Sequence, residues 1–286
     1  MRNFLLVLLF PLFSFCAQEK PYVIAKLFGQ LGNQLFQIAA ATSLALDNDA
    51  IAVFPDLESS DFNIPLNKAH VFQNLPSYTP SEKPTFYYTE PRFSYDPIPY
   101  KPNMVINGYF QSEKYFKKYK KEILELFEPS DAIKSYLHAK YSNIINHPKT
   151  VSIHLRMYLD TKPCLHPFVG WDYVKSSINQ FDKDSLFVVF SDQISHCKKR
   201  LPSLFPQHNF VFIEGNSHYH DLFLMSYCKS NIISNSSFSW WAAYLNKNHH
   251  KRVISPPLQK WHGPKNLHFF SKTKLDPIDI IPREWH

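Results

Sequence analysis

Beyond Pro148 the sequence alternates between short apolar segments and amphipathic ones, and this alternation constrains the fold more than any other feature of the chain. Segments rich in β-branched and aromatic residues predict strands at 151–155, 186–190, 210–213, 231–234 and 253–255. Helical patterns lie between them at 171–181, 193–201, 219–229 and 238–246. Strands and helices that alternate in this way form βαβ units around a parallel sheet.

The first half of the chain is less regular. It predicts strands at 22–28, 51–54 and 105–107, a buried alanine-rich helix at 35–46, and helices at 112–127 and 131–145. Residues 55–103 are rich in Pro, Tyr, Ser and Phe and show little periodicity, so we expect irregular surface there, suited to an acceptor-binding wall. The chain is therefore predicted to be α/β, with a leader at 1–20 and two domains at 21–148 and 149–286.

The leader consists of Arg2 followed by an apolar run from Phe4 to Phe15. This run is short for a membrane span and resembles the core of a signal peptide. A cleaved export signal and a shallow membrane anchor are both open. We expect either an exported protein of the secretory pathway or a membrane-associated one, with the cytoplasmic face not excluded.

The composition argues against a nucleic-acid-binding protein, a disulfide-rich scaffold and a metal site. The net charge is +7, which favours anionic partners, but the Lys and Arg residues are scattered and mostly predict solvated faces, so no nucleic-acid groove is expected. The four cysteines do not form a disulfide framework. Two Asp-x-Asp pairs, Asp47/Asp49 and Asp182/Asp184, follow helices and lead into strands, which places them at the amino edge of a sheet. We therefore expect no metal site.

Ligands of open parallel sheets bind beyond the carboxyl ends of the strands. The stretch Ser234–Leu245 combines such a strand end with hydroxyls, one amide and a helix that begins with Phe238, Trp240 and Trp241. Small polar side chains and free backbone N–H groups at a strand-to-helix turn suit a nucleotide diphosphate. The alternative is a capped helix whose tryptophans fill the core.

A second candidate is the glycine loop at 29–34. Gly29 and Gly32 permit close backbone approach, and the following helix offers its N-terminus to a phosphate or a sugar hydroxyl. Asn33 and Gln34 add donors. A plain tight turn is the competing interpretation.

The remaining candidates stand at the ends of two neighbouring strands. His154 and Arg156 share one face of their strand while Leu155 points into the core. The planar fork of an arginine suits a diphosphate, although a structural ion pair would also explain it. Ser191 and Asp192 could hold a ribose or a base, orient an arginine, or cap a helix. Asp221, at the start of a later helix, is interpreted as a cap.

Several of these segments resemble the α-1,2-fucosyltransferase family, glycosyltransferase family 11. The matching segments are GQLGNQLFQ at 29–37, GYFQSEKYF at 108–116, His154–Arg156, Phe190–Asp192 and DLFLMSYCKSNIISNSSFSWWAAYLN at 221–246. They occur in the family's order and span about residues 24–256. The last segment is long and distinctive.

The resemblance implies a GT-B-like architecture of two Rossmann-like halves with mostly parallel sheets that face a cleft. It implies an acceptor-side domain at 21–148 and a nucleotide-sugar-binding domain at 149–286. It also implies transfer of L-fucose from GDP-β-L-fucose to O2 of a terminal galactose in a glycan, with inversion and without a metal or other cofactor. The catalytic candidates are Arg156, His154 and Asp160, and the donor-binding candidates are Gly29, Gly32, Asn33, Gln34, Arg156, Ser191, Asp192, Asn235, Ser236, Ser237 and Phe238.

One departure from the family is local. The family pattern His-x-Arg-Arg-Gly-Asp is here His154-Leu155-Arg156-Met157-Tyr158-Leu159-Asp160, so the second arginine is Met157 and the glycine is Tyr158. The arginine expected to grip the diphosphate, Arg156, is retained. Two alternatives therefore stay open: a non-catalytic glycan- or nucleotide-binding homologue, and a transferase that uses another sugar nucleotide.

Overall fold

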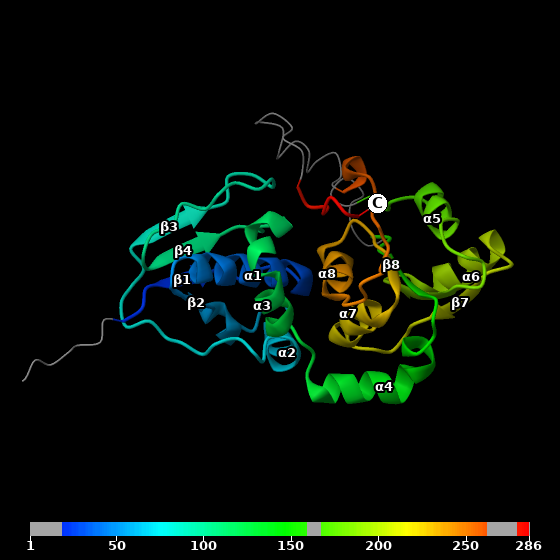
Figure 1. Ribbon diagram of the computed structural model, residues 1–286, viewed down its shortest axis with the longest axis horizontal. Helices are drawn as coiled ribbons and strands as arrows, with labels where there is room; N and C mark the ends of the chain where they lie inside the picture. Colours follow the sequence, from blue (N-terminus) through cyan, green and yellow to red (C-terminus); the bar gives the residue numbers. More distant parts are fainter. Residues whose placement is uncertain (1–18, 159–166, 262–278, 286) are drawn as a thin grey trace, which may run out of the picture.

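The computed structural model describes residues 19–158, 167–261 and 279–285 (Figure 1). Two parallel β-sheets lie side by side, one in each half of the chain, with helices packed on them. The architecture is the α/β, GT-B-like one expected. Of the leader predicted at 1–20, residues 1–18 lie outside the described residues. In the part of the chain that is described, no helix is long and apolar enough to cross a membrane.

The N-terminal sheet has the strand order β2-β1-β4-β3. Its strands are β1 (Tyr22–Ala25), β2 (Ile51–Val53), β3 (Phe86–Thr89) and β4 (Met104–Asn107). The helices of this half are α1 (Leu31–Asp47), α2 (Ile64–His70) and α3 (Lys120–Leu126). Short 3₁₀ turns lie at Pro55–Glu58, Glu113–Tyr115 and Lys117–Tyr119. Helix α4 (Asp131–Ile145) then leads into the second half (Figure 1).

The C-terminal sheet has the strand order β7-β6-β5-β8-β9. Its strands are β5 (Thr150–Leu155), β6 (Leu186–Ser191), β7 (Asn209–Phe212), β8 (Ser230–Ile232) and β9 (Val253–Ile254). Its helices are α5 (Trp171–Ile178), α6 (Ile194–Leu204), α7 (His218–Tyr227) and α8 (Ser237–Leu245), followed by a 3₁₀ turn at Leu258–Lys260. All pairings are parallel, as the βαβ alternation predicts.

The strands β1 and β5 are buried on both faces, so residues that alternate along each of them enter the packing on opposite sides of the sheet. In β5, Val151, Ile153 and Leu155 pack into the cluster that includes Val174 of α5 and Leu201 of α6. His154 lies on the opposite face, against the ring of Phe238 at 5.7 Å between centroids. The prediction that Leu155 enters the core while His154 faces the other way is confirmed.

The two halves share one continuous aromatic core. Phe36 of α1 packs against Trp240 and Trp241 of α8, with ring centroids 4.5 and 5.1 Å apart. Phe116 stacks on Trp241 at 5.4 Å, and Phe127 meets the same indole edge-on. These rings are fully buried. The tryptophans that begin α8 therefore join the halves as well as fill the C-terminal core.

Gly32 lets α1 and α8 approach each other at their N-terminal ends. A Cβ atom at this position would lie 2.5 Å from the backbone nitrogen of Phe238 and 2.6 Å from the carbonyl carbon of Ser237. Both are main-chain atoms, so no rotamer change could relieve the overlap. Gly32 is therefore needed for the contact between α1 and α8. The sequence had suggested that it allows close approach to a ligand.

Two expectations about the first half need correction. Helix α1 begins at Leu31, so Gly32, Asn33 and Gln34 belong to its first turn and not to a loop. Residues 55–103 contain α2 and the parallel strand β3, where irregular surface was expected. Strand β3 was missed because, as an edge strand, it carries a half-exposed pattern and lacks an apolar run.

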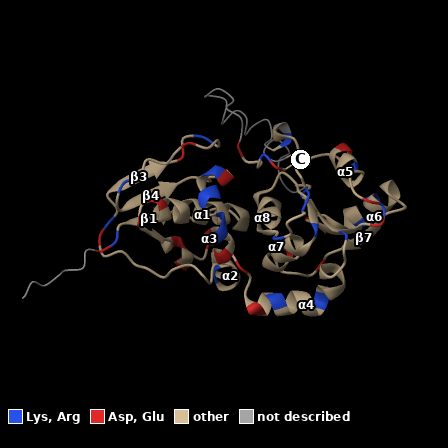
Figure 2. Ribbon diagram, viewed as in Figure 1, with Lys and Arg blue, Asp and Glu red and all other residues tan. Residues whose placement is uncertain are grey.

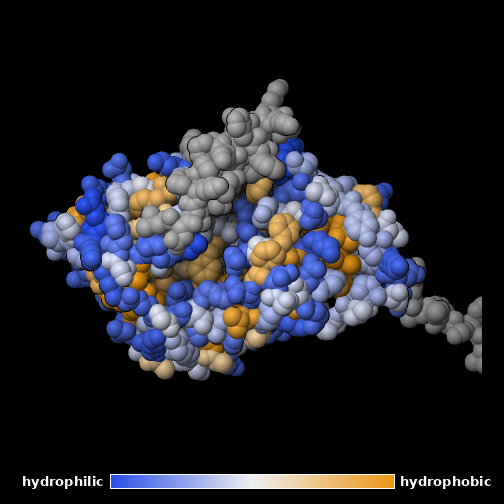
Figure 3. Space-filling model, turned by 180° about the vertical axis from the view of Figure 1, so that it is seen from behind, coloured by the Kyte–Doolittle hydropathy of each residue, from blue (hydrophilic) through white to orange (hydrophobic). Residues whose placement is uncertain are grey.

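Lys and Arg positions lie among Asp and Glu positions in both halves of the chain (Figure 2). The opposite face carries apolar residues as separate patches among hydrophilic ones (Figure 3).

Replacement of Gly32 by Ala tests the contact between α1 and α8. Intrinsic helix propensity alone would stabilise the variant by up to about 1 kcal/mol. The overlap with main-chain atoms of α8 should outweigh this gain and lower the free energy of unfolding by about 1–3 kcal/mol, measured by urea denaturation. Gly215→Ala measures the cost of backbone strain without an overlap, because that position has positive φ but no atom within 4 Å of an added Cβ. A Gly32→Ala protein as stable as the wild type would contradict the contact.

Candidate active site between the two halves

A pocket of about 660 Å³ opens where the N-termini of α1 and α8 meet the carboxyl ends of β5 and β6. The N-terminal half contributes uncharged residues to its wall, and the C-terminal half contributes ionisable ones. The lining consists of Gln30, Leu31, Gly32, Asn33, Phe93, Tyr109 and Gln111 from the first half, and His154, Arg156, Tyr158, Phe190, Ser191, Asp192, His218, Asp221, Asn235, Ser236, Ser237, Phe238 and Trp261 from the second.

Two helix N-termini face this pocket without a side-chain cap. In the described part of the chain, neither Gln30 before α1 nor Ser236 before α8 makes a capping hydrogen bond. The first N–H groups of a helix have no partner inside it and carry partial positive charge. The alternative interpretation of the 234–245 stretch was a capped helix whose tryptophans fill the core. Its tryptophans do fill the core, but no side chain of the described residues caps the helix.

Asn33 ties the two N-termini together. Its Oδ1 atom accepts hydrogen bonds from Ser237 Oγ at 3.0 Å and from Gln111 Nε2 at 2.9 Å. The three side chains come from α1, α8 and the segment after β4. The amide predicted to donate to a ligand thus fixes the relative position of the two halves beside the pocket.

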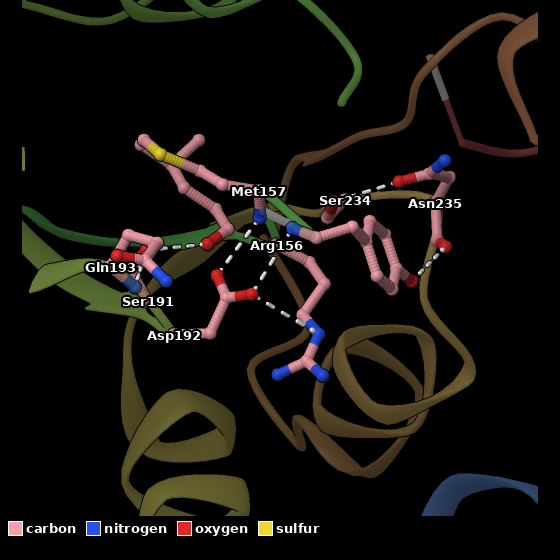
Figure 4. A network of polar contacts seen from close by, with 9 residues as sticks. Arg156, Met157, Ser191, Asp192, Gln193, Ser234 and Asn235 are labelled. Carbon is pink, nitrogen blue, oxygen red and sulfur yellow. Dashed lines mark hydrogen bonds and ion pairs between the residues drawn. The ribbon is translucent and has the colours of Figure 1, made fainter. Parts of the chain in front are cut away.

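Arg156 follows β5 and is held by Asp192, which follows the neighbouring strand β6 (Figure 4). Its Nε lies 3.5 Å from Asp192 Oδ2, and the two terminal nitrogens point away from that carboxylate. The Arg156 side chain is 44% exposed and lines the pocket. The ion pair therefore orients the guanidinium and leaves its terminal face toward the pocket, instead of burying it in the interior.

Asp192 also shapes the turn that carries Arg156. Its two oxygens accept the backbone N–H groups of Met157 at 2.8 Å and Tyr158 at 3.1 Å. Of the roles expected for Asp192, the orientation of an arginine is the one observed. Ser191 Oγ donates to the carbonyl of Leu155 at 2.7 Å, which ties the ends of β5 and β6 together.

The two departures from the family pattern have different structural consequences. Met157 is buried in the hydrophobic cluster of the C-terminal sheet and does not line the pocket. Tyr158 does line it, with a positive φ of 54°, a conformation that glycine adopts without strain. Its hydroxyl donates to the carbonyl of Asn235 at 3.2 Å, and its ring lies 5.1 Å from Cζ of Arg156. Tyr158 thus fills space in the pocket that a glycine would leave open.

His154 lies at the floor of the pocket and is only 8% exposed. Burial lowers its pKa to about 4, and the neighbouring Arg156 cation acts in the same direction while Asp192 opposes it. The imidazole is therefore neutral near pH 7. Its Nδ1 atom has no hydrogen-bond partner among the described residues. This atom is itself buried, so other atoms of the imidazole form the part of His154 that lines the pocket.

Asp221 is a pocket residue that the sequence had indicated only as a cap. Helix α7 begins at His218 after the N-cap Ser217, so Asp221 stands inside the first turn. Its Oδ1 accepts from Asn216 Nδ2 at 3.0 Å. Burial raises its pKa to about 6, against the opposing effects of the Asn216 hydrogen bond and the Lys140 cation. The signal available in the sequence was its place at the start of the long family segment.

The pocket brings together most of the predicted site residues. Those that line it are Gly32, Asn33, His154, Arg156, Ser191, Asp192, Asn235, Ser236, Ser237 and Phe238. Gly29 and Gln34 do not: Gln34 is fully buried and donates to the carbonyls of Gly29 and Phe62 at 2.8 and 3.0 Å, so it stabilises the turn before α1. Asp160 lies outside the described residues.

The side chain of Asn235 also serves the protein interior, since its Nδ2 donates to the carbonyls of Pro167 and Lys260 at 2.8 and 3.0 Å. Neither Asp-x-Asp pair lines the pocket, as predicted. Asp182 and Asp184, for example, both contact Lys149 Nζ at 2.9 Å. The expectation of a metal-independent site stays a prediction.

The raised pKa of Asp221 predicts a specific pH dependence of stability. The folded state binds the proton of the Asp221 carboxyl more tightly than the unfolded state does. The contribution of Asp221 to the free energy of unfolding is therefore fully present below about pH 4 and is lost as the pH rises through 6. At about 1.4 kcal/mol per tenfold change in proton affinity, the loss is at most about 3 kcal/mol. Urea denaturation at several pH values should therefore show Asp221→Asn gaining stability relative to the wild type between pH 4 and 7.

Parallel profiles for the wild type and Asp221→Asn would show that the Asp221 carboxyl is hydrated in solution, contrary to its position in the structure.

Comparisons with known proteins agree with this architecture. Residues 25–262 match the family described as glycosyl transferase family 11. An α-1,2-colitosyltransferase of Escherichia coli is 30% identical over 92% of this chain and 97% of its own length. Galactoside α-(1,2)-fucosyltransferase 2 of Oryctolagus cuniculus is 27% identical over 76% of this chain and 65% of its own length.

Among solved structures, the fucosyltransferase NodZ from Bradyrhizobium superposes with a TM-score of 0.53 at 14% identity, over 78% of this chain and 93% of that one. This likeness concerns the fold. The family match covers most of the chain, including both halves and the pocket between them. The chain therefore belongs to glycosyltransferase family 11, with similarity to its α-1,2-fucosyltransferase-type members.

Proposed function

We propose that this glycosyltransferase transfers L-fucose from GDP-β-L-fucose to O2 of a terminal galactose in a glycan, with inversion and without a metal. The observation that carries the proposal is the convergence of Arg156 with the uncapped N-termini of α1 and α8 on one pocket. Helix N-termini and an arginine fork are the groups that bind a diphosphate best. The relatives named for α-1,2 transfer support the linkage.

In the proposed reaction, the C1–O bond of the fucosyl group breaks and negative charge grows on the departing GDP. The acceptor oxygen forms a new bond to C1 and loses its proton to a base. Arg156, the first N–H groups of the two helices and the hydroxyl of Ser236 stabilise the leaving diphosphate. Ser237 Oγ donates its proton to Asn33 Oδ1, so this hydroxyl would have to exchange that partner to donate to the diphosphate. Preorganised donors act strongly on charge that develops in a water-poor pocket.

The base is proposed to be Asp160 or His154. A general base works best when its pKa is near the working pH. The pKa of His154, about 4, makes this imidazole a weak base, comparable to an ordinary aspartate carboxylate, so basicity alone does not choose between the two residues.

Asp221 is proposed to bind the donor's guanine. Both oxygens of Asp192 already accept backbone N–H groups, so Asp221 is the pocket carboxylate with more capacity to accept from a ligand. Guanine presents a ring N–H beside an exocyclic amine, two adjacent donors that suit one carboxylate.

Donors that carry another sugar should also be tested, because the E. coli relative that matches over 92% of this chain is a colitosyltransferase. A screen of sugar nucleotides with lactose present, read by the nucleoside diphosphate that each donor releases, separates the possibilities. Calorimetry with GDP-fucose identifies the non-catalytic alternative, which predicts binding without turnover on a wide acceptor panel.

Arg156→Ala should lower turnover by at least about a hundredfold, since it removes the cation that faces the leaving diphosphate. Arg156→Lys keeps the charge but loses the planar fork, so its turnover should lie between those of Arg156→Ala and the wild type. Arg252→Ala is the matched control, because that guanidinium bonds Gln180 outside the pocket. Near-normal turnover in Arg156→Ala would remove this residue from the mechanism.

Inosine diphosphate, which lacks the exocyclic amine of GDP, tests the role of Asp221. The wild type should bind GDP about tenfold more tightly than inosine diphosphate, and Asp221→Asn should lose most of that preference, measured by calorimetry. An unchanged preference together with a lower kcat would instead assign Asp221 to proton transfer.

A further inference from the structure

The wall of the pocket that belongs to the N-terminal half differs in chemistry from the wall that holds Arg156. It presents two aromatic rings, Phe93 and Tyr109, and three amides, Gln30, Asn33 and Gln111. Among the described lining residues of this half, none carries a charge. A wall of this composition suits a neutral ligand rich in hydroxyl groups and C–H faces.

The two rings form a braced platform. Phe93 and Tyr109 stack with centroids 5.2 Å apart and planes inclined by 26°. Phe28 meets Tyr109 edge-on at 4.8 Å. Both pocket rings are half-buried, so they pack against the protein and still present surface to the pocket.

The backbone beneath the platform is fixed as well. Glu90, just after β3, accepts the N–H of Tyr109 at 2.6 Å and that of Phe110 at 3.1 Å. It packs directly on Gly108, where an added Cβ would lie 2.4 Å from the Cβ of Glu90. A carboxylate that binds two successive amides holds the turn after β4, and with it the Tyr109 ring, in one position.

We propose that Phe93 and Tyr109 form the subsite for the pyranose ring of the acceptor sugar, an inference that rests on the proposed function. Aromatic faces carry negative charge and attract the weakly positive C–H groups on one face of a sugar ring. The neighbouring amides supply donors and acceptors for its hydroxyls. Because the diphosphate is assigned to Arg156 and to the N-termini of α1 and α8, the two rings are left for the acceptor, and the two substrates meet across the pocket.

The test uses the full chain loaded with GDP and an array of galactose-terminated glycans that includes lactose. The wild type should bind at least one of them. Tyr109→Ala and Phe93→Ala should weaken that binding about tenfold each, measured by calorimetry with the tightest glycan, while the Kd for GDP stays within about twofold. Tyr109→Phe keeps the ring and should behave as the wild type. Tyr87→Ala, at a residue that is 67% exposed and outside the pocket lining, should also have no effect.

Three results would overturn the inference. Unchanged glycan binding in both alanine variants would exclude the rings from the acceptor subsite. A tenfold loss of GDP affinity with unchanged glycan binding would assign the rings to the nucleobase. A wild type that binds GDP but none of the glycans would refute the acceptor subsite and would leave the proposed donor site unaffected. Failure of the wild type to bind GDP or GDP-fucose would instead count against the proposed function itself.

Discussion

The close approach of α1 and α8 is the contact on which the rest of the structure depends. Gly32 permits it, and the rings of Phe36, Trp240 and Trp241 fill the space behind it. Because the two helices meet at their N-terminal ends, residues of both first turns line the same pocket, and the first N–H groups of a helix have no partner inside it. One interface thus joins the two halves of the chain and places two partial positive charges where a diphosphate is proposed to bind.

Several polar groups around this contact bond to other parts of the protein and so hold the pocket in shape. Asn33, Ser237 and Gln111 bond one another across the halves, and Asp192 holds the turn that presents Arg156. Met157 enters the core, so its replacement of the family's second arginine does not empty the pocket. Tyr158 has the larger effect on the pocket, since its ring occupies space where the family has a glycine.

Much of the fold followed from sequence because strands β5–β9 and helices α5–α8 carry strong, regular patterns. The site residues at the ends of β5 and β6 followed from the same pattern, since parallel strands share one carboxyl edge. Strand β3, the start of α1 and the pocket role of Asp221 did not follow. The pairing of β3 and the place of Asp221 in the pocket both depend on contacts between segments that are distant in the sequence. Such contacts leave no local periodicity in a sequence.

A structure of the protein with bound GDP tests the central claim most directly. The account predicts the diphosphate between the terminal nitrogens of Arg156 and the backbone N–H groups that begin α8, with Asp192 still on Nε of the arginine. A diphosphate bound elsewhere, or an Arg156 whose terminal nitrogens contact only protein carboxylates in the complex, would contradict it.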